Sequence, residues 1–259
     1  MSAETQEAAV VVDGVTLGYD ATVIQRDVSF EVWRGEVFGI LGGSGSGKST
    51  LLKVLFGLHP PLHGRVLLEG EDLTAARGAA RARLLRRFGV MYQSGALFGS
   101  MTVLENVRLP LDEFTDLDIE ERELVALAKL DQVGLCQAAR KLPGQLSGGM
   151  QKRVALARAM ALDPAILFLD EPSAGLDPII SADIDALIRG LSRRFGITSV
   201  IVTHELSSIF AIIDRCVLLD GEARAVIAEG RPGELRDHST DARVLRFFRR
   251  EAEQGASAR

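Results

Sequence analysis

A glycine-rich segment between a strand pattern and a helix pattern constrains this chain more than any other feature. Residues 42–49 read GGSGSGKS and fit the pattern G-x-x-x-x-G-K-[ST]. The apolar run Val37–Leu41 comes before them, and leucines at helical spacing come after them: Leu51, Leu52, Leu55 and Leu58. Glycine lets the backbone curl around a phosphate group, so that successive N–H groups and the start of the helix point to its oxygens. The sequence therefore predicts a strand, a phosphate-binding loop and a helix.

The predicted loop assigns roles to particular side chains. Lys48 would bring its positive charge to the β and γ phosphates of a nucleotide, and the Ser49 hydroxyl would ligate Mg²⁺. The residues expected to contact the nucleotide here are Gly42, Gly43, Ser44, Gly45, Ser46, Gly47, Lys48, Ser49 and Thr50. A flexible Gly/Ser loop is the alternative, but the strand before the segment and the helix after it argue for a nucleotide site.

An apolar run that ends in two carboxylates is the second signal. Residues 166–171 read ILFLDE. Burying a charge without a partner costs free energy, so a buried strand rarely ends in acids unless a cation offsets them. We expect Asp170 to hold Mg²⁺ through water and Glu171 to polarise the water that attacks the γ-phosphate. The alternative is a pair of solvated acids at the end of a strand.

A second anion site is indicated by residues 146–153, which read LSGGMQKR. Ser147 lies 23 residues before Asp170, and Ser-Gly-Gly at the start of a helix offers backbone N–H groups to a phosphate. We therefore expect Ser147, Gly148 and Gly149 to bind phosphate, which gives one chain two phosphate sites.

Strand and helix patterns alternate along most of the chain. Strand patterns cover 10–17, 28–32, 37–41 and 65–69 and return at 166–169, 199–202, 216–219 and 225–228, the later ones separated by helix patterns at 182–195 and 205–213. This alternation predicts an α/β fold with a parallel sheet covered on both faces. Residues from about 94 to 163 hold helix patterns and no convincing strand. We expect one domain over 1–259, with its core at about 8–93 and 164–232, a helical subdomain at about 94–163 and a C-terminal tail at 233–259.

Composition excludes several other classes of protein. Thirty Lys and Arg against 35 Asp and Glu give a net charge of −5, which does not favour nucleic acid as a partner. The two cysteines, Cys136 and Cys216, lie far apart, so we expect a reduced compartment such as the cytosol. The opening residues do not read as a signal peptide, and no run approaches the roughly 18 apolar residues of a membrane span. If the protein works at a membrane, another chain supplies the membrane part.

Taken together, these motifs resemble the ATP-binding cassette (ABC) ATPases, whose signature segment is usually written LSGGQ. The resemblance covers residues from about 10 to 232 and implies a P-loop NTPase with a RecA-like core, an inserted helical subdomain and an antiparallel N-terminal β-subdomain. It implies ATP and Mg²⁺ as ligands. It further implies that Tyr19 stacks on adenine, that Gln93 reaches the metal and the attacking water, and that His204 contacts the γ-phosphate. Ser173–Asp177 matches the D-loop.

One residue departs from the family pattern, because Met150 stands where the signature usually has Gln, although Gln151 follows. Ser147 and Gly149 are intact.

If the loop and the signature lie on opposite faces of one subunit, neither completes a site alone. We then expect two copies, arranged head to tail, to enclose two ATP molecules, each held by one chain's loop and the other's Ser147 and Gly149.

The chain has one cassette and no long heptad array, which favours the ATPase subunit of a transporter over a soluble, non-transport ABC ATPase. The sequences of four segments, QSGALF, MTVLENV, LSGGM and EPSAGLDPI, are similar to those of the Mla-type ATPases of MCE-domain lipid transporters. That resemblance implies phospholipid transport between inner and outer membranes, at the cytoplasmic face of the inner membrane. The partners it implies are a multi-span permease, an MCE-domain protein and a STAS-domain protein. A polar-solute importer is the nearer alternative.

Three further groups of residues have two interpretations each. Leu97, Phe98, Met101 and Val103 could form a groove for a helix of the permease or could pack between the two lobes. Five arginines could meet anionic lipid headgroups, although a solvated helix face is the favoured interpretation: Arg77, Arg81, Arg83, Arg86 and Arg87. Phe247 and Phe248 could pack on a sister subunit or on their own domain.

Overall fold

The computed structural model describes residues 7–20 and 22–249, and its centre is a six-stranded, mostly parallel sheet. The strand order is β10-β9-β3-β8-β7-β6. Five neighbouring strands run parallel, and β10 pairs antiparallel with β9 at one edge. The strands are β3 (Val37–Gly42), β6 (Phe88–Met91), β7 (Ile166–Asp170), β8 (Thr198–Val202), β9 (Arg215–Asp220) and β10 (Ala225–Gly230). This arrangement confirms the predicted α/β fold.

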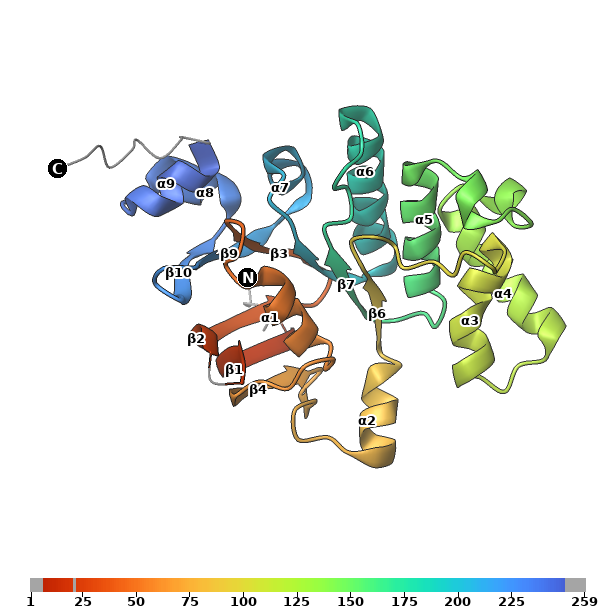
Figure 1. The fold of residues 1–259 in the computed structure, drawn as a ribbon, viewed down its shortest axis with the longest axis horizontal. Helices are drawn as coiled ribbons and strands as arrows, with labels where there is room; N and C mark the ends of the chain where they lie inside the picture. Colours follow the sequence, from red (N-terminus) through yellow and green to blue (C-terminus); the bar gives the residue numbers. More distant parts are fainter. Residues whose placement is uncertain (1–6, 21, 250–259) are drawn as a thin grey trace, which may run out of the picture.

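A second sheet, antiparallel and four-stranded, lies against the first (Figure 1). Its order is β2-β1-β4-β5, and its strands are β1 (Ala8–Tyr19), β2 (Thr22–Trp33), β4 (His63–Leu68) and β5 (Glu71–Asp72). β1 pairs antiparallel with both β2 and β4. This sheet corresponds to the antiparallel N-terminal β-subdomain that the family resemblance implies.

The parallel sheet is buried on both faces because its apolar side chains alternate between two cores. In β7, Leu167 and Leu169 belong to one hydrophobic cluster, whereas Ile166 and Phe168 belong to the other. Successive side chains of a strand point to opposite faces, so a strand that is covered on both faces is apolar throughout. The continuous run ILFL is explained by this double burial.

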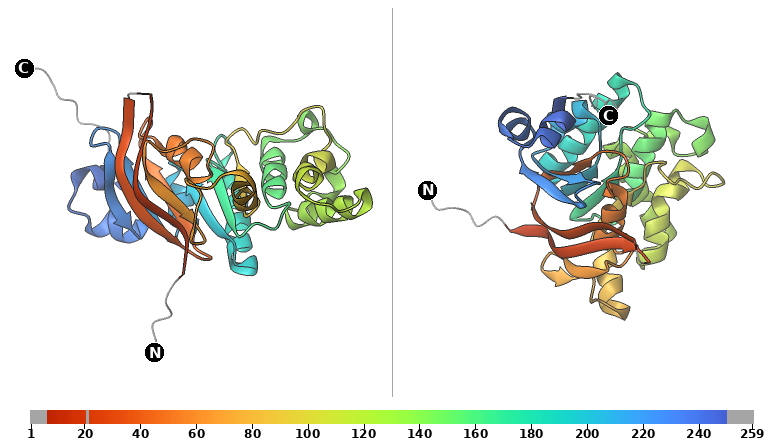
Figure 2. Two further views of the ribbon diagram at one scale, coloured as in Figure 1. Left: turned by 90° about the horizontal axis from the view of Figure 1, so that it is seen from below. Right: turned by 60° about the vertical axis from the view of Figure 1, so that its left-hand side comes forward.

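The helices cover both faces of the parallel sheet and form a separate group at one end. They are α1 (Lys48–Leu55), α2 (Gly78–Leu85), α3 (Val103–Phe114), α4 (Ile119–Gln132), α5 (Gly148–Ala159), α6 (Pro178–Phe195), α7 (Leu206–Ile212), α8 (Pro232–His238) and α9 (Ala242–Arg249). Short 3-10 turns lie at Cys136–Ala138 and Pro143–Gln145. Figure 2 shows α3, α4 and α5 gathered at the end of the molecule opposite α8 and α9. Among the described residues, no helix combines the length and apolar character of a membrane span.

Residues 94–163 hold helices, turns and loops, as their sequence pattern predicts. α5 packs on α3 and also on β6 and α6, so it joins the helical group to the sheet. The division into a core and a helical subdomain stays a prediction. Two strands have no counterpart in the predicted pattern, since β5 has two residues and β6 only four. The last part of the predicted tail, residues 250–259, lies outside the described residues.

Candidate nucleotide site

The loop after β3 adopts backbone conformations that only glycine takes easily. Gly42, Gly45 and Gly47 have φ angles of 151°, 78° and 90°. A Cβ atom at Gly42 would lie 2.6 Å from the carbonyl oxygen of Leu219 and 2.5 Å from Oγ of Ser46. The glycine spacing of the motif therefore allows a backbone path that other residues would block. Gly43, Ser44 and Gly45 are exposed, and Thr50 is partly exposed on α1.

Lys48 lies over this loop. Its Nζ atom donates hydrogen bonds to the carbonyl oxygens of Gly42, at 2.9 Å, and of Gly43, at 2.7 Å. Burial lowers the pKa of Lys48, while Glu171 and Asp170 act in the opposite direction. The ammonium group is thus held at the concave side of the glycine loop, where an anion would share its charge.

Asp170, the last residue of β7, is brought next to the start of α1. The Oγ atom of Ser49 donates a hydrogen bond of 3.3 Å to Oδ1 of Asp170. The pKa of Asp170 is raised, because the effect of burial outweighs the opposite effect of the hydrogen bond from Ser49. A hydroxyl and a carboxylate at this spacing are hard oxygen ligands, which fit Mg²⁺ and its usual shell of water and phosphate oxygens. The predicted pair of Ser49 and Asp170 is therefore assembled in space across 121 residues of sequence.

Glu171 is buried and held by its backbone and its side chain. Its φ angle is 48°, and its N–H donates to the carbonyl oxygen of Val202 at 2.9 Å. Oε1 lies 2.6 Å from Nδ1 of His204, whose side chain is 59% exposed. The buried Oε2 atom has no hydrogen-bond partner among the described residues. One carboxylate oxygen is thus oriented by His204, and the other can accept a hydrogen bond from a water molecule.

Lys152 is a buried residue of this site that the sequence did not reveal. Its ammonium group donates to the carbonyl oxygen of Gln93 and, at 3.2 Å, to that of Glu171. Burial lowers the pKa of Lys152. Gln93 itself is exposed. A lysine is rarely buried without a partner, and both partners here are backbone atoms of other segments, which no local pattern identifies.

Ser147 caps α5, with its Oγ accepting a hydrogen bond of 3.3 Å from the N–H of Met150. Ser147 and Gly148 are exposed, and Gly149 is buried. A Cβ atom at Gly149 would lie 2.4 Å from Cγ2 of Ile180, so this glycine permits close packing of α5 on α6. Figure 1 shows α5 well apart from α1, so one chain does not bring its signature to its own phosphate loop.

Met150, the fifth residue of the signature, and Gln151, which follows it, both pack inside their own chain. Met150 packs against the core, and the Gln151 side chain donates to the carbonyl oxygens of Pro143 and Leu146. Gln151 therefore stabilises the turn before α5 and does not replace the glutamine that the signature usually carries.

Tyr19 is 45% exposed and contacts a second ring. Its centroid lies 4.6 Å from that of His59, and Nε2 of His59 lies 2.9 Å from the carbonyl oxygen of Gly18. His59 is a further residue that the sequence did not single out. Its ring supports the aromatic side chain that is predicted to stack on adenine.

The predicted D-loop connects the acidic strand to α6. Ser173 is buried, and its Oγ lies 3.3 Å from Oγ of Ser208. Asp177 caps α6 by accepting hydrogen bonds of 3.1 Å from the N–H groups of Ile179 and Ile180. The exposed part of the segment thus lies between two anchored ends.

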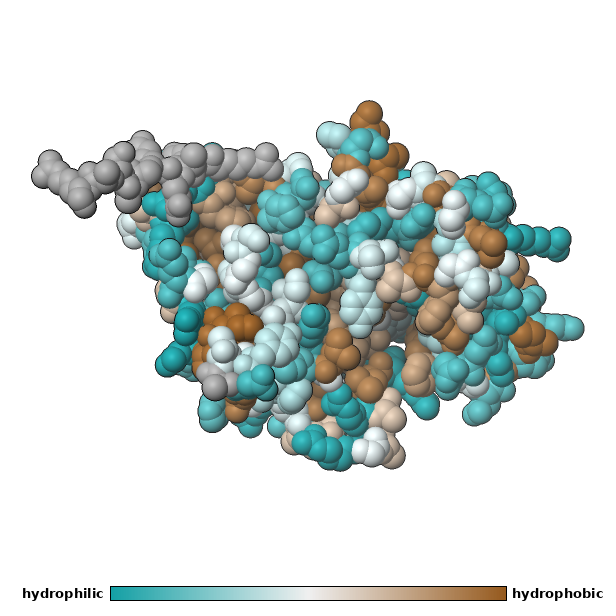
Figure 3. Space-filling view, in the orientation of Figure 1, coloured by the Kyte–Doolittle hydropathy of each residue, from teal (hydrophilic) through white to brown (hydrophobic). Residues whose placement is uncertain are grey.

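Of the two interpretations of Leu97, Phe98, Met101 and Val103, packing inside the chain accounts for Val103, which is fully buried in α3. Leu97 packs against the core, whereas Phe98 is 50% exposed. Figure 3 shows apolar residues gathered in the region of α2, β6 and α3. Leu85 on α2 and Phe114 on α3 are exposed apolar residues, and the guanidinium group of Arg86, next to Leu85, lies 5.5 Å from the Phe114 ring. The exposed apolar surface therefore differs in composition from a groove formed by the four residues that the sequence offered.

Most of the arginines near α2 interact with their own chain. Arg83 and Arg87 pair with Glu71, and Arg81 donates to the carbonyl oxygen of Gly57. The guanidinium group of Arg86 lies 5.5 Å from the ring centroid of Phe114. These contacts agree with the solvated helix face that the sequence favours over a lipid-binding patch.

The two phenylalanines of α9 pack within the chain. Phe248 is buried and lies 5.9 Å from Phe210 and 5.2 Å from Phe247, measured between ring centroids. Of the two interpretations of these residues, packing on their own domain therefore accounts for Phe248.

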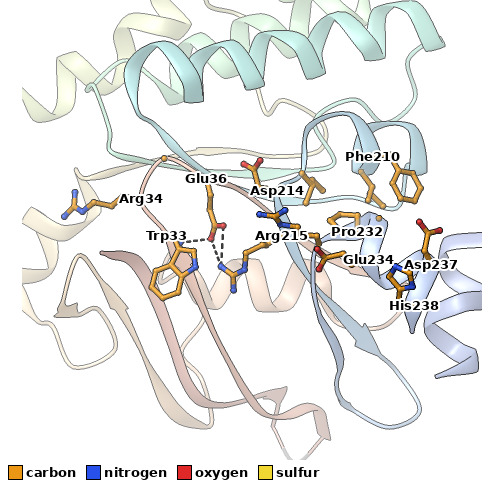
Figure 4. A pocket seen from close by; sticks show the side chains of 15 residues that line it. Trp33, Arg34, Glu36, Phe210, Asp214, Arg215, Pro232, Glu234, Asp237 and His238 are labelled. Atoms are coloured by element: carbon orange, nitrogen blue, oxygen red, sulfur yellow. Dashed lines mark hydrogen bonds and ion pairs between the residues drawn. The ribbon is translucent and has the colours of Figure 1, made fainter. Parts of the chain in front are cut away.

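A separate cleft of about 940 Å³ lies at the opposite edge of the parallel sheet, at the amino ends of β3 and β9. Figure 4 shows Arg215 beside Trp33 and Glu36, and Nη1 of Arg215 lies 3.1 Å from Oε1 of Glu36. Burial raises the pKa of Glu36, against the effects of Trp33 and Arg215. Ligands of open α/β sheets bind at the carboxyl ends of the strands, and none of the predicted site residues lines this cleft. The loop after β3 therefore remains the predicted nucleotide site.

Comparisons with known proteins identify the family of this chain. Residues 25–174 match the family described as ABC transporter. The intermembrane phospholipid transport system ATP-binding protein MlaF of Haemophilus influenzae is 38% identical over 231 residues, which are 89% of this chain and 86% of that protein. The methionine import ATP-binding protein MetN of Caulobacter vibrioides is 40% identical over 231 residues, 89% of this chain and 68% of that protein.

Solved structures resemble the whole fold. The dimeric structure of MJ0796, a bacterial ABC transporter cassette, superposes with a TM-score of 0.77 at 32% identity and covers 86% of this chain and 98% of that one. A second dimeric structure of MJ0796 represents a post-hydrolysis state bound to ADP and Pi.

Proposed function

This chain belongs to the ABC transporter family as an ATP-binding subunit that hydrolyses ATP to drive transport, and from that premise we propose that its cargo is phospholipid moving between two membranes. The single observation that supports this cargo is the 38% identity with the intermembrane phospholipid transport protein MlaF over 89% of the chain. Because the cassette itself contacts nucleotide rather than cargo, the proposal rests on resemblance to a relative.

We propose that the residues around the β3–α1 loop hold MgATP. Backbone N–H groups of Gly42–Ser49 bind the phosphates, and Lys48 exchanges its two carbonyl partners for phosphate oxygens. Ser49 and Gln93 would ligate Mg²⁺ directly, and Asp170 would hold it through water. When bound, Mg²⁺ neutralises part of the charge that develops on the phosphoryl group. Tyr19, supported by His59, stacks on the adenine ring.

In the proposed hydrolysis step, Glu171 accepts a hydrogen bond from the attacking water through the buried Oε2 atom. His204 fixes the other carboxylate oxygen and, being 59% exposed, also reaches the γ-phosphate side of the site. The positions of these two side chains before ATP arrives reduce the reorganisation that the reaction needs.

We propose that the active species is a dimer of this chain, because Ser147 lies far from the same chain's phosphate loop (Figure 1). In a head-to-tail pair, each γ-phosphate would contact the loop of one copy and the exposed Ser147 and Gly148 of the other. The buried Gly149 acts there through the packing of α5 on α6. Hydrolysis removes the anion that joins the copies, so the dimer loosens after each cycle.

The proposed membrane partners are a multi-span permease, an MCE-domain protein and a STAS-domain protein. The apolar surface at α2, β6 and α3, with Leu85, Phe98 and Phe114, is the proposed contact for the permease. Through the permease, the chain would work at the cytoplasmic face of a bacterial inner membrane, without nucleic acid as a partner.

Import of a polar solute is the second candidate, since the methionine importer MetN is 40% identical over the same share of the chain. Copurification separates the two. The chain would be extracted with its permease from its native membrane in a mild detergent, and bound lipid and small molecules would be identified by mass spectrometry. Phospholipid beyond that of an unrelated permease, together with an MCE-domain protein, supports the proposal. A bound amino acid and a periplasmic solute-binding protein would replace it with import.

A further inference from the structure

Gln25 is a fully buried polar residue whose side chain forms a hydrogen bond with the backbone of the phosphate loop. It lies on β2, and its Nε2 atom donates a hydrogen bond of 2.8 Å to the carbonyl oxygen of Ser46 and one of 2.9 Å to that of Asp220. Its Oε1 atom is buried and has no hydrogen-bond partner among the described residues. A buried amide with one orphaned oxygen costs stability, so its two donated bonds need an explanation.

The strand that carries Gln25 also touches the next residue of the loop. A Cβ atom at Gly47 would lie 2.6 Å from Cγ2 of Ile24, and the φ angle of Gly47 is 90°. Ile24 and Gln25 therefore contact two consecutive residues of the loop, one through packing and one through a hydrogen bond. Strand β2 thus supports the loop at two consecutive residues.

The second hydrogen bond of Gln25 ties this support to the end of the parallel sheet. Asp220 is the last residue of β9, and the next residue, Gly221, lies against the backbone of Ser46. The carboxylate of Asp220 accepts a hydrogen bond of 2.6 Å from the N–H of Ala223, which fixes the turn before β10. One amide group thus holds the loop and the end of the sheet at a set spacing.

We propose that Gln25 is a positioning residue for the phosphate loop, an inference that rests on the proposed role of residues 42–49. The peptide unit between Ser46 and Gly47 is planar and trans, so its C=O and N–H point in opposite directions. Gln25 binds the C=O on the outer side of the loop. It thereby directs the N–H of Gly47 inward, toward the oxygens of a bound phosphate.

The test is a Gln25→Met variant, whose side chain is unbranched and of similar length but donates no hydrogen bond. The structure predicts that KM for ATP and the equilibrium Kd of MgATP rise roughly tenfold, as expected for two lost hydrogen bonds. The kcat should change little, because Gln25 does not touch the reacting atoms. ATPase kinetics and titration calorimetry on the full chain measure both quantities.

Val32→Ala is the matched control. Val32 is a fully buried residue of the same strand, seven positions further along and therefore about 23 Å away. It should lower the melting temperature without raising KM. If Gln25→Met lowers the melting temperature by a similar amount and leaves KM unchanged, Gln25 is only a structural residue and the proposal is wrong.

Gln25→Glu gives an independent measurement if Gln25→Met does not fold. A buried carboxyl group has a raised pKa, and its protonated form can donate one hydrogen bond to Ser46 or Asp220. The ratio of this variant's KM to that of wild type at the same pH should therefore decrease as the pH is lowered from 8 to 6. A ratio that does not change with pH contradicts the proposal.

Lys48→Ala separates this inference from the proposed site. Loss of ATP binding in Lys48→Ala, together with the effects above, supports both. If Lys48→Ala binds ATP with wild-type affinity, residues 42–49 are not the nucleotide site. Gln25 would then have no nucleotide-binding loop to position.

Discussion

At the scale of single residues, the site holds titratable groups whose ionised forms are disfavoured by burial. Burial raises the pKa of Asp170 and lowers the pKa of Lys48 and Lys152. Each group is therefore less stable in its ionised form than it would be in water. Such groups reduce the stability of the folded chain in exchange for a site that binds a charged ligand strongly.

Asp170→Asn is expected to stabilise the nucleotide-free protein while abolishing hydrolysis. The folded pKa of Asp170 lies above its unfolded value, so the stability that its proton contributes is present below the unfolded pKa and is lost as pH rises through the folded pKa. Asparagine has no such charge. The gain is about 1 kcal/mol or less, because Asp170 is partly exposed.

Thermal unfolding of both proteins at pH 5 and pH 8 measures this effect. The difference in melting temperature between variant and wild type should be larger at pH 8. A variant that is less stable than wild type at both values would contradict the assigned cause.

Glu171→Gln is expected to bind MgATP with near wild-type affinity and to hydrolyse it roughly 10²- to 10⁴-fold more slowly, since an amide cannot accept a proton from water. The variant should also accumulate as a closed dimer in ATP, visible by light scattering. Lys48→Ala, which should lose ATP binding, is the control for the dimer's dependence on nucleotide. Normal turnover by Glu171→Gln would remove the role assigned to this carboxylate.

The sequence identified the residues whose type and local order carry information, and it missed those defined only by contacts in space. The glycine loop and the acid pair form local patterns, and the structure brings Ser49, Asp170 and Lys48 together. Gln25 and Lys152 bind backbone carbonyl groups of distant segments. Backbone carbonyls have no residue identity, so no sequence pattern points to them.

At the scale of secondary structure, long elements could be predicted and short ones could not. β7 and the sheet's central strand β3 read as largely apolar runs, because both of their faces are covered. β6 has four residues, and β5 has two acidic ones, so neither contains enough residues for a periodic pattern. Their places are determined by pairing with β7 and β4.

Gly149→Ala tests the contact between α5 and α6. The added methyl group would lie 2.4 Å from Cγ2 of Ile180, so the two helices must separate or Ile180 must move. We expect a loss of about 1–3 kcal/mol in unfolding free energy, as for other overpacked sites, and lower ATPase activity because Ser147 moves with α5.

Chemical denaturation and ATPase assays measure these two effects. The double variant Gly149→Ala, Ile180→Leu, whose leucine has no β-branch and therefore lacks the Cγ2 atom that meets the new methyl group, should recover part of the stability. If it recovers none, the helix contact is not the cause.

At the scale of the whole molecule, the two segments that are predicted to bind phosphate lie well apart in one chain (Figures 1 and 2). The sequence predicts both segments and implies a dimer through the family resemblance, but it contains no distance between them. That distance follows from the placement of α5 beyond β7 and α6, which is a property of the folded chain.

Mixing two inactive variants tests whether each site needs two chains. Lys48→Ala damages only the loop, and Ser147→Arg damages only the signature. In an equal mixture, half of the dimers contain one of each chain, and such a dimer has one intact site, so roughly a quarter of wild-type activity should return. Each variant alone is the control. A mixture no more active than its components would mean that one chain completes its own site.

Lys152 connects three segments of the candidate site. Its ammonium group joins the backbone beside Gln93 to the backbone of Glu171, and it belongs to the helix whose first turn begins at Ser147. A shift of α5 relative to either segment would therefore break one of these two hydrogen bonds.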